Sequence, residues 1–226
     1  MRTLVKVLDT GSVYWYNEYG GEIMIFEYGQ KEMEYLCQSD TLLAKVIREA
    51  GFIEREVDPD IFASLVKSII GQQIANAALE TVLGRLRKTV GEITPENICA
   101  LGRDGLRACG MSMRKAENIL SLAEKIQIGE INLDTLGDMS DEEVIRCLTS
   151  LDGVGVWTAE MTLIFSLGRK NVLSYGDFGI RKGIELLYGE KKLTRAKWRE
   201  YYKRYSPYVS VASFYLWKVG NGEIEI

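Results

Sequence analysis

The 226-residue sequence contains no histidine and only 3 prolines. Without an imidazole, proton transfer in any reaction would rest on carboxylates, Tyr, Lys, Cys or water. No run approaches the roughly 18 uninterrupted apolar residues that a membrane span needs, and the first twenty residues lack the layout of a signal peptide. We therefore expect an intracellular, cytoplasmic protein.

Cysteine is also scarce, and its spacing is unsuited to metal binding. The four residues, Cys37, Cys99, Cys109 and Cys147, form no CxxC pair. Zinc sites and iron–sulfur clusters need closely grouped thiolates. Together with the lack of histidine, this spacing predicts neither a metal site nor a cofactor.

The net charge of −4 is low, but the charge is unevenly distributed. Residues 1–60 hold 6 Lys/Arg against 12 Asp/Glu, whereas residues 166–204 hold 11 Lys/Arg against 4 Asp/Glu. Such asymmetry suits a protein that presents one face to a polyanion, although a solvated helix face would produce the same composition.

The first thirty residues differ from the rest of the chain. The β-prone runs LVKVL (4–8), SVYWY (12–16) and EIMIFEY (22–28) alternate with glycine-containing turns, which predicts strands. From residue 30 onward, helical periodicity predicts helices over 30–38, 40–50, 59–70, 73–89, 95–100, 103–109, 113–127, 140–149, 156–167, 178–188, 194–204 and 207–219. We therefore predict a mostly α fold, with a β-rich N-terminal extension at 1–29 and a helical domain at 30–226.

The segment 148–161 predicts two helices joined by a tight turn. Gly153, Val154 and Gly155 follow the first helix, and a second helix starts at once. Two glycines one residue apart permit a tight turn and a close backbone approach to a ligand. The N–H groups that open the second helix form a ready phosphate site. The segment 106–119 also joins two helices, at Gly110, and we interpret it as a plain connector with surface charges.

Asp177 precedes a predicted helix, 22 residues after Gly155. Taken alone, it would be interpreted as a helix N-cap, which is a very common role for Asp. The intervening helix is short enough for the chain to return Asp177 close to the hairpin.

Four segments together resemble one family. They are L-D-G-V-G-V-W-T-A at 151–159, the Asp177 segment with its following I-R-K-G, I-I-G-Q-Q-I at 69–74, and S-P-Y-V-S-V-A-S-F-Y-L-W at 206–217. In this order they resemble the helix-hairpin-helix GPD superfamily of base-excision repair DNA glycosylases, specifically the DNA-3-methyladenine glycosylase II family, over about residues 30–220. The resemblance implies a two-lobed helical core containing the hairpin at 148–161.

The resemblance also implies residue roles. Asp177 would be the catalytic carboxylate, and the pocket for the extruded base would include Trp157, Tyr208, Met161 and Gln72. Contacts to double-stranded DNA would come from Gln73 (the wedge into the duplex), Gly153, Val154, Gly155, Thr158, Arg181 and Lys182. Core packing is the competing interpretation of the two aromatic residues.

The reaction type follows from one position. Bifunctional relatives carry a Lys where this sequence has Trp157, and that amine attacks the sugar and leads to strand cleavage. An indole cannot do this, so we expect water as the nucleophile and no strand cleavage. We also expect release of alkylated purines, 3-methyladenine and 7-methylguanine, by a monomer that needs no obligate protein partner and, in a bacterium, associates with the nucleoid.

The sequence departs from the family in two places. Gly176 stands where the family often has a second acid, and some relatives have an aromatic residue in place of Met161. Two alternatives stay open: a glycosylase for deaminated or mismatched bases such as uracil or hypoxanthine, and a non-catalytic helix-hairpin-helix DNA-binding protein.

Overall fold

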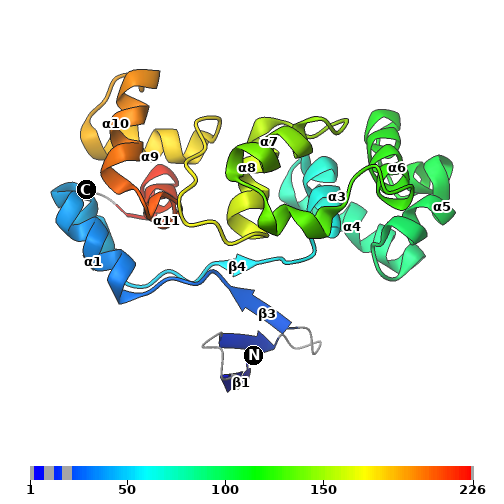
Figure 1. Ribbon diagram of the computed structural model, residues 1–226, viewed down its shortest axis with the longest axis horizontal. Helices are drawn as coiled ribbons and strands as arrows, with labels where there is room; N and C mark the ends of the chain where they lie inside the picture. Colours follow the sequence, from blue (N-terminus) through cyan, green and yellow to red (C-terminus); the bar gives the residue numbers. More distant parts are fainter. Residues whose placement is uncertain (1–2, 8–12, 17–21, 225–226) are drawn as a thin grey trace. The chain divides into compact units, whose positions relative to one another are not determined.

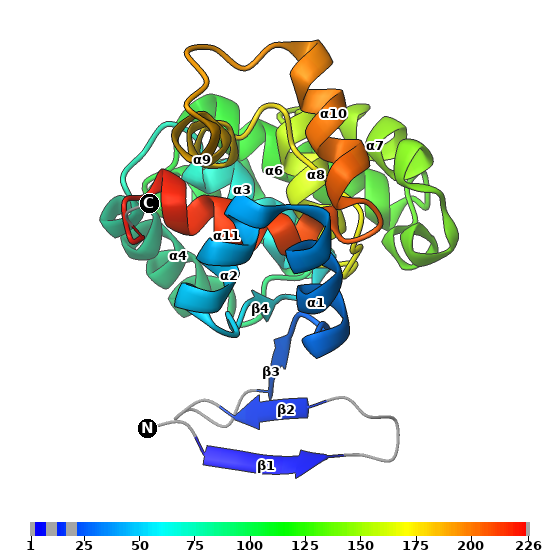
Figure 2. The same ribbon diagram turned by 90° about the vertical axis from the view of Figure 1, so that its left-hand side faces the viewer.

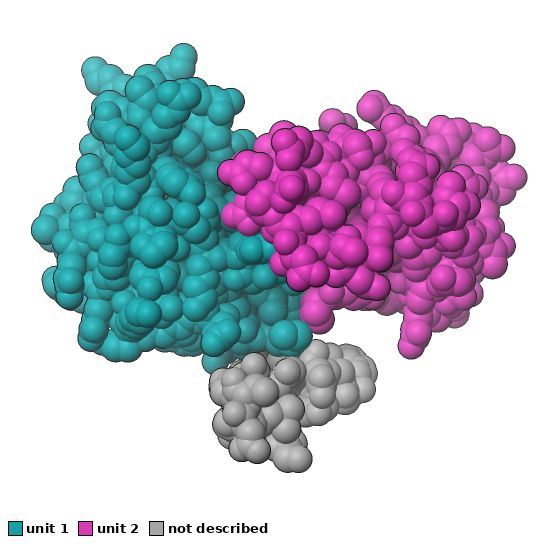
Figure 3. Space-filling view, viewed as in Figure 1, with its two compact units in different colours: residues 1–58, 163–226 teal, residues 59–162 magenta. Residues whose placement is uncertain are grey.

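The computed structural model describes residues 3–7, 13–16 and 22–224. The chain divides into two compact units (Figure 3): unit 1 comprises residues 1–58 and 163–226, and unit 2 comprises residues 59–162. The chain thus begins in unit 1, forms the whole of unit 2 and then returns to unit 1. The prediction of a mostly helical, two-lobed fold is confirmed.

The N-terminal strands form a small antiparallel sheet (Figures 1 and 2). β1 (Thr3–Val7), β2 (Val13–Tyr16), β3 (Glu22–Ile25) and β4 (Glu56–Val57) pair in sequence order. Residues 8 and 12, which the predicted strands include, lie outside the described residues. The third predicted strand extends too far, since β3 ends at Ile25, and β4 was not predicted.

Five helices belong wholly to unit 1. They are α1 (Gln30–Ser39), α2 (Thr41–Ala50), α9 (Phe178–Tyr188), α10 (Arg195–Tyr205) and α11 (Val209–Gly220). Helix α11 packs against both α9 and α2 (Figure 2), and its residues from Val209 to Leu216 are all buried. It is therefore the central helix of unit 1.

The backbones of α9 and α11 come unusually close because three glycines lie at their contact. A Cβ on Gly183 would lie 2.1 Å from the Leu216 carbonyl oxygen, and one on Gly220 would lie 2.2 Å from that of Gly179. No larger residue fits at 183 or 220 unless a helix moves. The spacing between these two helices is therefore set by backbone contact.

Unit 2 contains α3 (Ile61–Gly71), α4 (Asn76–Val90), α5 (Pro95–Ala108), α6 (Met113–Gln127), the 3₁₀ helix η1 (Leu133–Asp138) and α7 (Asp141–Thr149). Helix α8 (Val156–Phe165) begins in unit 2 and ends in unit 1. Leu65, Ile69, Leu86 and Ile98 are fully buried in the unit 2 core. Among the described residues, no helix is long and apolar enough to cross a membrane.

Local sequence signals set several helix boundaries. The Thr94 hydroxyl accepts a hydrogen bond from the Asn97 N–H at 3.2 Å, and Ser140 forms a capping box with Glu143. Gly102, at φ +68°, interrupts α5, which confirms the two helices predicted there. The predicted helix 73–89 begins too early, because Gln73 has a φ of +58° that a helix cannot contain.

Candidate active site

Asp177 lies in unit 1 as the N-cap of α9, and its side chain is 8% exposed. Its Oδ1 accepts a hydrogen bond of 2.8 Å from the Ile180 N–H, so the capping role is real. The same oxygen accepts a second hydrogen bond of 2.8 Å from the indole Nε1 of Trp217 on α11. Both donors point at one oxygen, which lies at the N-terminal end of α9.

Trp217 is held in place by its aromatic neighbours. Its ring stacks on Phe165 at 5.8 Å and on Phe214 at 6.1 Å between centroids, and the Arg55 guanidinium lies 5.9 Å from its centroid. Gly179 leaves room for the indole, since a Cβ there would lie 2.7 Å from Trp217 Cδ1. The indole N–H therefore has a fixed direction toward Asp177.

Basic side chains lie near the N-terminal end of α9, which Asp177 caps. The Arg181 guanidinium lies 5.0 Å from the Tyr175 ring centroid, and Arg195 covers the same ring at 3.9 Å. Nε of Arg181 is buried without a hydrogen-bond partner among the described residues. Lys182 is exposed. This part of unit 1 therefore offers cationic groups beside the carboxylate helix.

Two further aromatic side chains of unit 1 are accessible. Tyr208, at the N-cap of α11, is half-buried and packs edge-on against Tyr35, with ring centroids 5.2 Å apart. Phe178, directly after Asp177, is 78% exposed. The Phe178 ring is therefore outside the core, although it directly follows a buried carboxylate. Phe178 is not among the site residues predicted from the sequence.

The hairpin of unit 2 has the predicted form, with α7 and α8 joined through Gly153 and Gly155. Gly153 has a φ of +81°, and a Cβ there would lie 2.3 Å from Nδ2 of Asn118. Val154 is buried, whereas Gly155 is exposed and has no atom within 4 Å of where its Cβ would be. A ligand could therefore reach the backbone at Gly155 closely.

The first turn of α8 presents an exposed aromatic side chain. Trp157 is 44% exposed and Val156 is 54% exposed, so neither is packed in the core. Thr158 is buried, with its hydroxyl 3.5 Å from that of Ser68. Met161, one turn further along, is half-buried.

The loop between α3 and α4 contacts the hairpin directly. The Gln72 side chain donates a hydrogen bond of 2.7 Å from Nε2 to the carbonyl of Gly153. Gln73, the next residue, is exposed and has a φ of +58°. Gln72 is thus engaged with the hairpin turn, and Gln73 is left pointing to solvent with a strained backbone.

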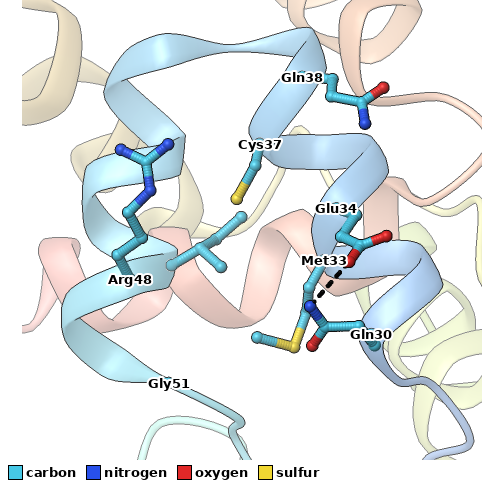
Figure 4. A pocket seen from close by; sticks show the side chains of 8 residues that line it. Gln30, Met33, Glu34, Cys37, Gln38, Arg48 and Gly51 are labelled. Carbon is cyan, nitrogen blue, oxygen red and sulfur yellow. Dashed lines mark hydrogen bonds between the residues drawn. The ribbon is translucent and has the colours of Figure 1, made fainter.

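A separate pocket of about 420 Å³ lies between α1 and α2 in unit 1 (Figure 4). The side chain of Gln30 donates a 2.9 Å hydrogen bond to Glu34 along its wall, and Cys37 and Arg48 also line it. Burial raises the pKa of the Cys37 thiol. None of the site residues predicted from the sequence lines this pocket.

Within each unit, the structure brings some predicted residues together. Gln72 contacts the hairpin in unit 2, and Asp177, Arg181 and Lys182 lie together at the N-terminal end of α9 in unit 1. Sequence reasoning missed the link from Trp217 to Asp177, although the C-terminal motif that ends in Trp217 was recognised. That motif was the available signal.

The helical hairpin and the capped carboxylate define a class of DNA repair protein. The family model described as "HhH-GPD superfamily base excision DNA repair protein" matches residues 66–207, and the chain belongs to this superfamily.

Proteins similar to this chain are named as 3-methyladenine glycosylases or glycosidases. The DNA-3-methyladenine glycosylase 1 of Schizosaccharomyces pombe is 33% identical over 168 residues, which cover 71% of this chain and 72% of that protein. A crystal structure of the DNA-3-methyladenine glycosidase of Bacillus halodurans superposes with a TM-score of 0.78 at 36% identity, covering 87% of this chain and 92% of that one. The S. pombe 3-methyladenine DNA glycosylase in complex with abasic DNA superposes with a TM-score of 0.73 at 29% identity, covering 84% and 96%.

Proposed function

We propose that this protein is a monofunctional DNA glycosylase that extrudes alkylated purines from duplex DNA and hydrolyses their N-glycosidic bond. The observation that carries this proposal is the Asp177 carboxylate, which is held by the Ile180 N–H and the Trp217 indole in a chain of the base-excision repair superfamily. Relatives named as 3-methyladenine glycosylases support the choice of substrate.

Asp177 acts on the sugar rather than on the base. Cleavage of the glycosidic bond builds positive charge on the deoxyribose, and a fixed carboxylate stabilises that charge. Because two donors and a helix N-terminus already orient Asp177, little reorganisation is needed when the bond breaks. The same carboxylate can orient the attacking water.

The chain supplies aromatic surfaces for an electron-poor base. Trp157, Tyr208 and Phe178 all have accessible rings, and a cationic base is attracted to such rings through cation–π contacts. An alkylated purine is also a good leaving group, so it departs without a strong general acid. This suits a sequence that has no histidine. With an indole at residue 157 in place of an amine, water remains the nucleophile.

DNA is held mainly through its phosphates in this proposal. The N–H groups at the start of α8 and the backbone at Gly155 suit one phosphate, and Arg181 and Lys182 suit others. Gln73, exposed at the end of its loop, enters the gap that the extruded base leaves. No partner protein takes part in these steps, and we propose a monomer.

A base-release assay tests the proposal. Purified protein is given methylated DNA beside duplexes that contain uracil, hypoxanthine or 8-oxoguanine, and single-turnover rates are compared. We expect 3-methyladenine and 7-methylguanine to be released fastest. A clear preference for uracil would overturn the assignment of alkylated purines. Binding without release of any base would instead support a non-catalytic DNA-binding protein.

A further inference from the structure

The loop that follows α3 has a backbone conformation that is unfavourable unless other groups stabilise it. Gln73 has a φ of +58°, in the left-handed region that residues with a Cβ rarely adopt. The nearby backbone hydrogen bonds are long: the Gln72 N–H to the Ile69 carbonyl and the Ile74 N–H to the Gly71 carbonyl both measure 3.4 Å. Such a conformation persists only where surrounding groups hold it.

Lys115 on α6 is one of these groups. Its Nζ donates hydrogen bonds of 2.7 Å to the carbonyl of Ile70 and 2.7 Å to that of Gln72. Carbonyls at the end of a helix lack an N–H partner within that helix, and they lie at the negative end of its dipole. An ammonium is therefore well suited to hold the chain where α3 ends and the loop begins.

The same face of α6 supports the hairpin turn. Asn118 lies three residues after Lys115, and this spacing places both side chains on one side of the helix. Asn118 occupies the space that a Cβ on Gly153 would need, and the Gly153 carbonyl accepts the hydrogen bond from Gln72. The loop and the hairpin turn are thus joined to each other and to one face of α6.

Lys115 is an unfavourable residue for a position that only caps a helix, because partial burial of its ammonium costs free energy. Its side chain is half-buried, and burial lowers its pKa. The salt bridges found among the described residues do not include it, and its ammonium is hydrogen-bonded to backbone carbonyls instead. An apolar side chain would avoid this desolvation but would leave the carbonyls of Ile70 and Gln72 without these hydrogen bonds, so the ammonium serves to hold the loop.

We propose that Lys115 is a positioning residue that holds residues 71–74 in the shape from which Gln73 enters the DNA, in register with the hairpin. This inference rests on the proposed function for the role of Gln73 only, since the anchoring itself can be measured without DNA. The segment 106–119 is then more than the plain connector that its sequence suggests.

The first experiment measures hydrogen exchange of the Gln72 and Ile74 amides in the free protein. In Lys115→Met, which keeps an apolar stem, we expect these amides to exchange about tenfold faster, as the loss of charge-assisted hydrogen bonds implies. Lys115→Arg should restore slow exchange. Lys125→Met is the matched control, because Lys125 lies on the same helix and pairs with Glu130. Peptides from α7 report any global loss of stability.

The second experiment measures base extrusion by 2-aminopurine fluorescence beside the lesion. We expect Lys115→Met and Gln73→Ala each to reduce extrusion, and the double variant to be no worse than Gln73→Ala, because Lys115 acts through that residue. Unchanged exchange in Lys115→Met, or fully additive effects in the double variant, would overturn the proposal. If Gln73→Ala extrudes bases normally while Lys115→Met loosens the loop, the wedge role in the proposed function is wrong and the anchoring stands.

Discussion

The indole Nε1 of Trp217 donates a 2.8 Å hydrogen bond to Oδ1 of Asp177, although forty residues separate the two in the chain. The contact depends on the close packing of α9 against α11, and it gives the carboxylate a second donor besides its own helix.

Trp217→Phe should slow base release by roughly tenfold or more, because a hydrogen bond to a charged group contributes about 1.5–3 kcal/mol. Phenylalanine keeps stacking on Phe165 and Phe214, so the fold should persist. Single-turnover rates at saturating enzyme measure the effect. Trp198→Phe, at a buried tryptophan elsewhere in unit 1, is the control and should release bases at the normal rate. Equal losses in both variants would mean that the effect is structural.

Asp177→Asn should lower the rate of base release on the order of a hundredfold or more, since charge stabilisation of the developing cation is lost. Asparagine is as good an N-cap as aspartate, so the melting temperature and DNA affinity should change little. Asp60→Asn, at the N-cap of α3, is the matched control. Near-normal turnover by Asp177→Asn would contradict the catalytic assignment.

Borohydride should not trap the wild-type protein on substrate DNA. The position that carries an amine in bifunctional relatives is Trp157, which cannot form a Schiff base. The measurement is gel analysis of the protein incubated with substrate and borohydride, with a bifunctional glycosylase as the positive control. Efficient trapping, or strand scission without heat or alkali, would show that another amine serves as nucleophile.

DNA affinity should fall steeply with salt despite the net charge of −4. Lys182→Ala should reduce the log–log slope by about 0.9, the value for one phosphate contact. Lys197→Ala is the matched control, because Lys197 lies in the same basic region but pairs with Glu190. Fluorescence anisotropy between 50 and roughly 200 mM salt gives both slopes. Identical slopes for wild type and Lys182→Ala would show that Lys182 contacts no phosphate.

Glu32→Gln should remove part of the stability that the protein has near neutral pH. Although burial opposes ionisation, hydrogen bonds from the Gly29 N–H and Lys170 hold the pKa of Glu32 below its ordinary value. The ionised group therefore stabilises the fold above its unfolded pKa of about 4.3, and this contribution is lost as the pH falls through the lower folded pKa. The difference in melting temperature between wild type and variant should shrink as the pH falls through that range. Glu34→Gln, on the exposed side of α1, is the matched control for the substitution itself.

Much of the fold could be predicted from local sequence because its signals are local. Thr94 with Pro95, and Ser140 with Glu143, each mark a helix start through side chains within three residues. The hairpin was predictable for the same reason, since Gly153 and Gly155 lie within a single turn. The two-residue strand β4 escaped prediction because so short a segment has no periodicity to detect.

The contacts that position the candidate site are long-range, so a single sequence carries no local signal for them. Trp217 reaches Asp177 only once α11 has packed on α9. Lys115 reaches Gln72 across 43 residues, and in the sequence it is indistinguishable from a surface lysine. Gln73 was placed inside a helix because its neighbours are good helix formers, and its positive φ depends on tertiary anchoring.

In the proposed function, the three glycines between α9 and α11 make the position of the Asp177 carboxylate independent of the exposed rings proposed to contact the base. Because main-chain atoms set that spacing, replacing exposed rings such as Trp157 or Phe178 leaves the helix pair that carries Asp177 and Trp217 undisturbed. The rings proposed to contact the base can therefore vary while the carboxylate keeps its position. An alanine at residue 183 would end that independence at once, since it would push the two helices apart.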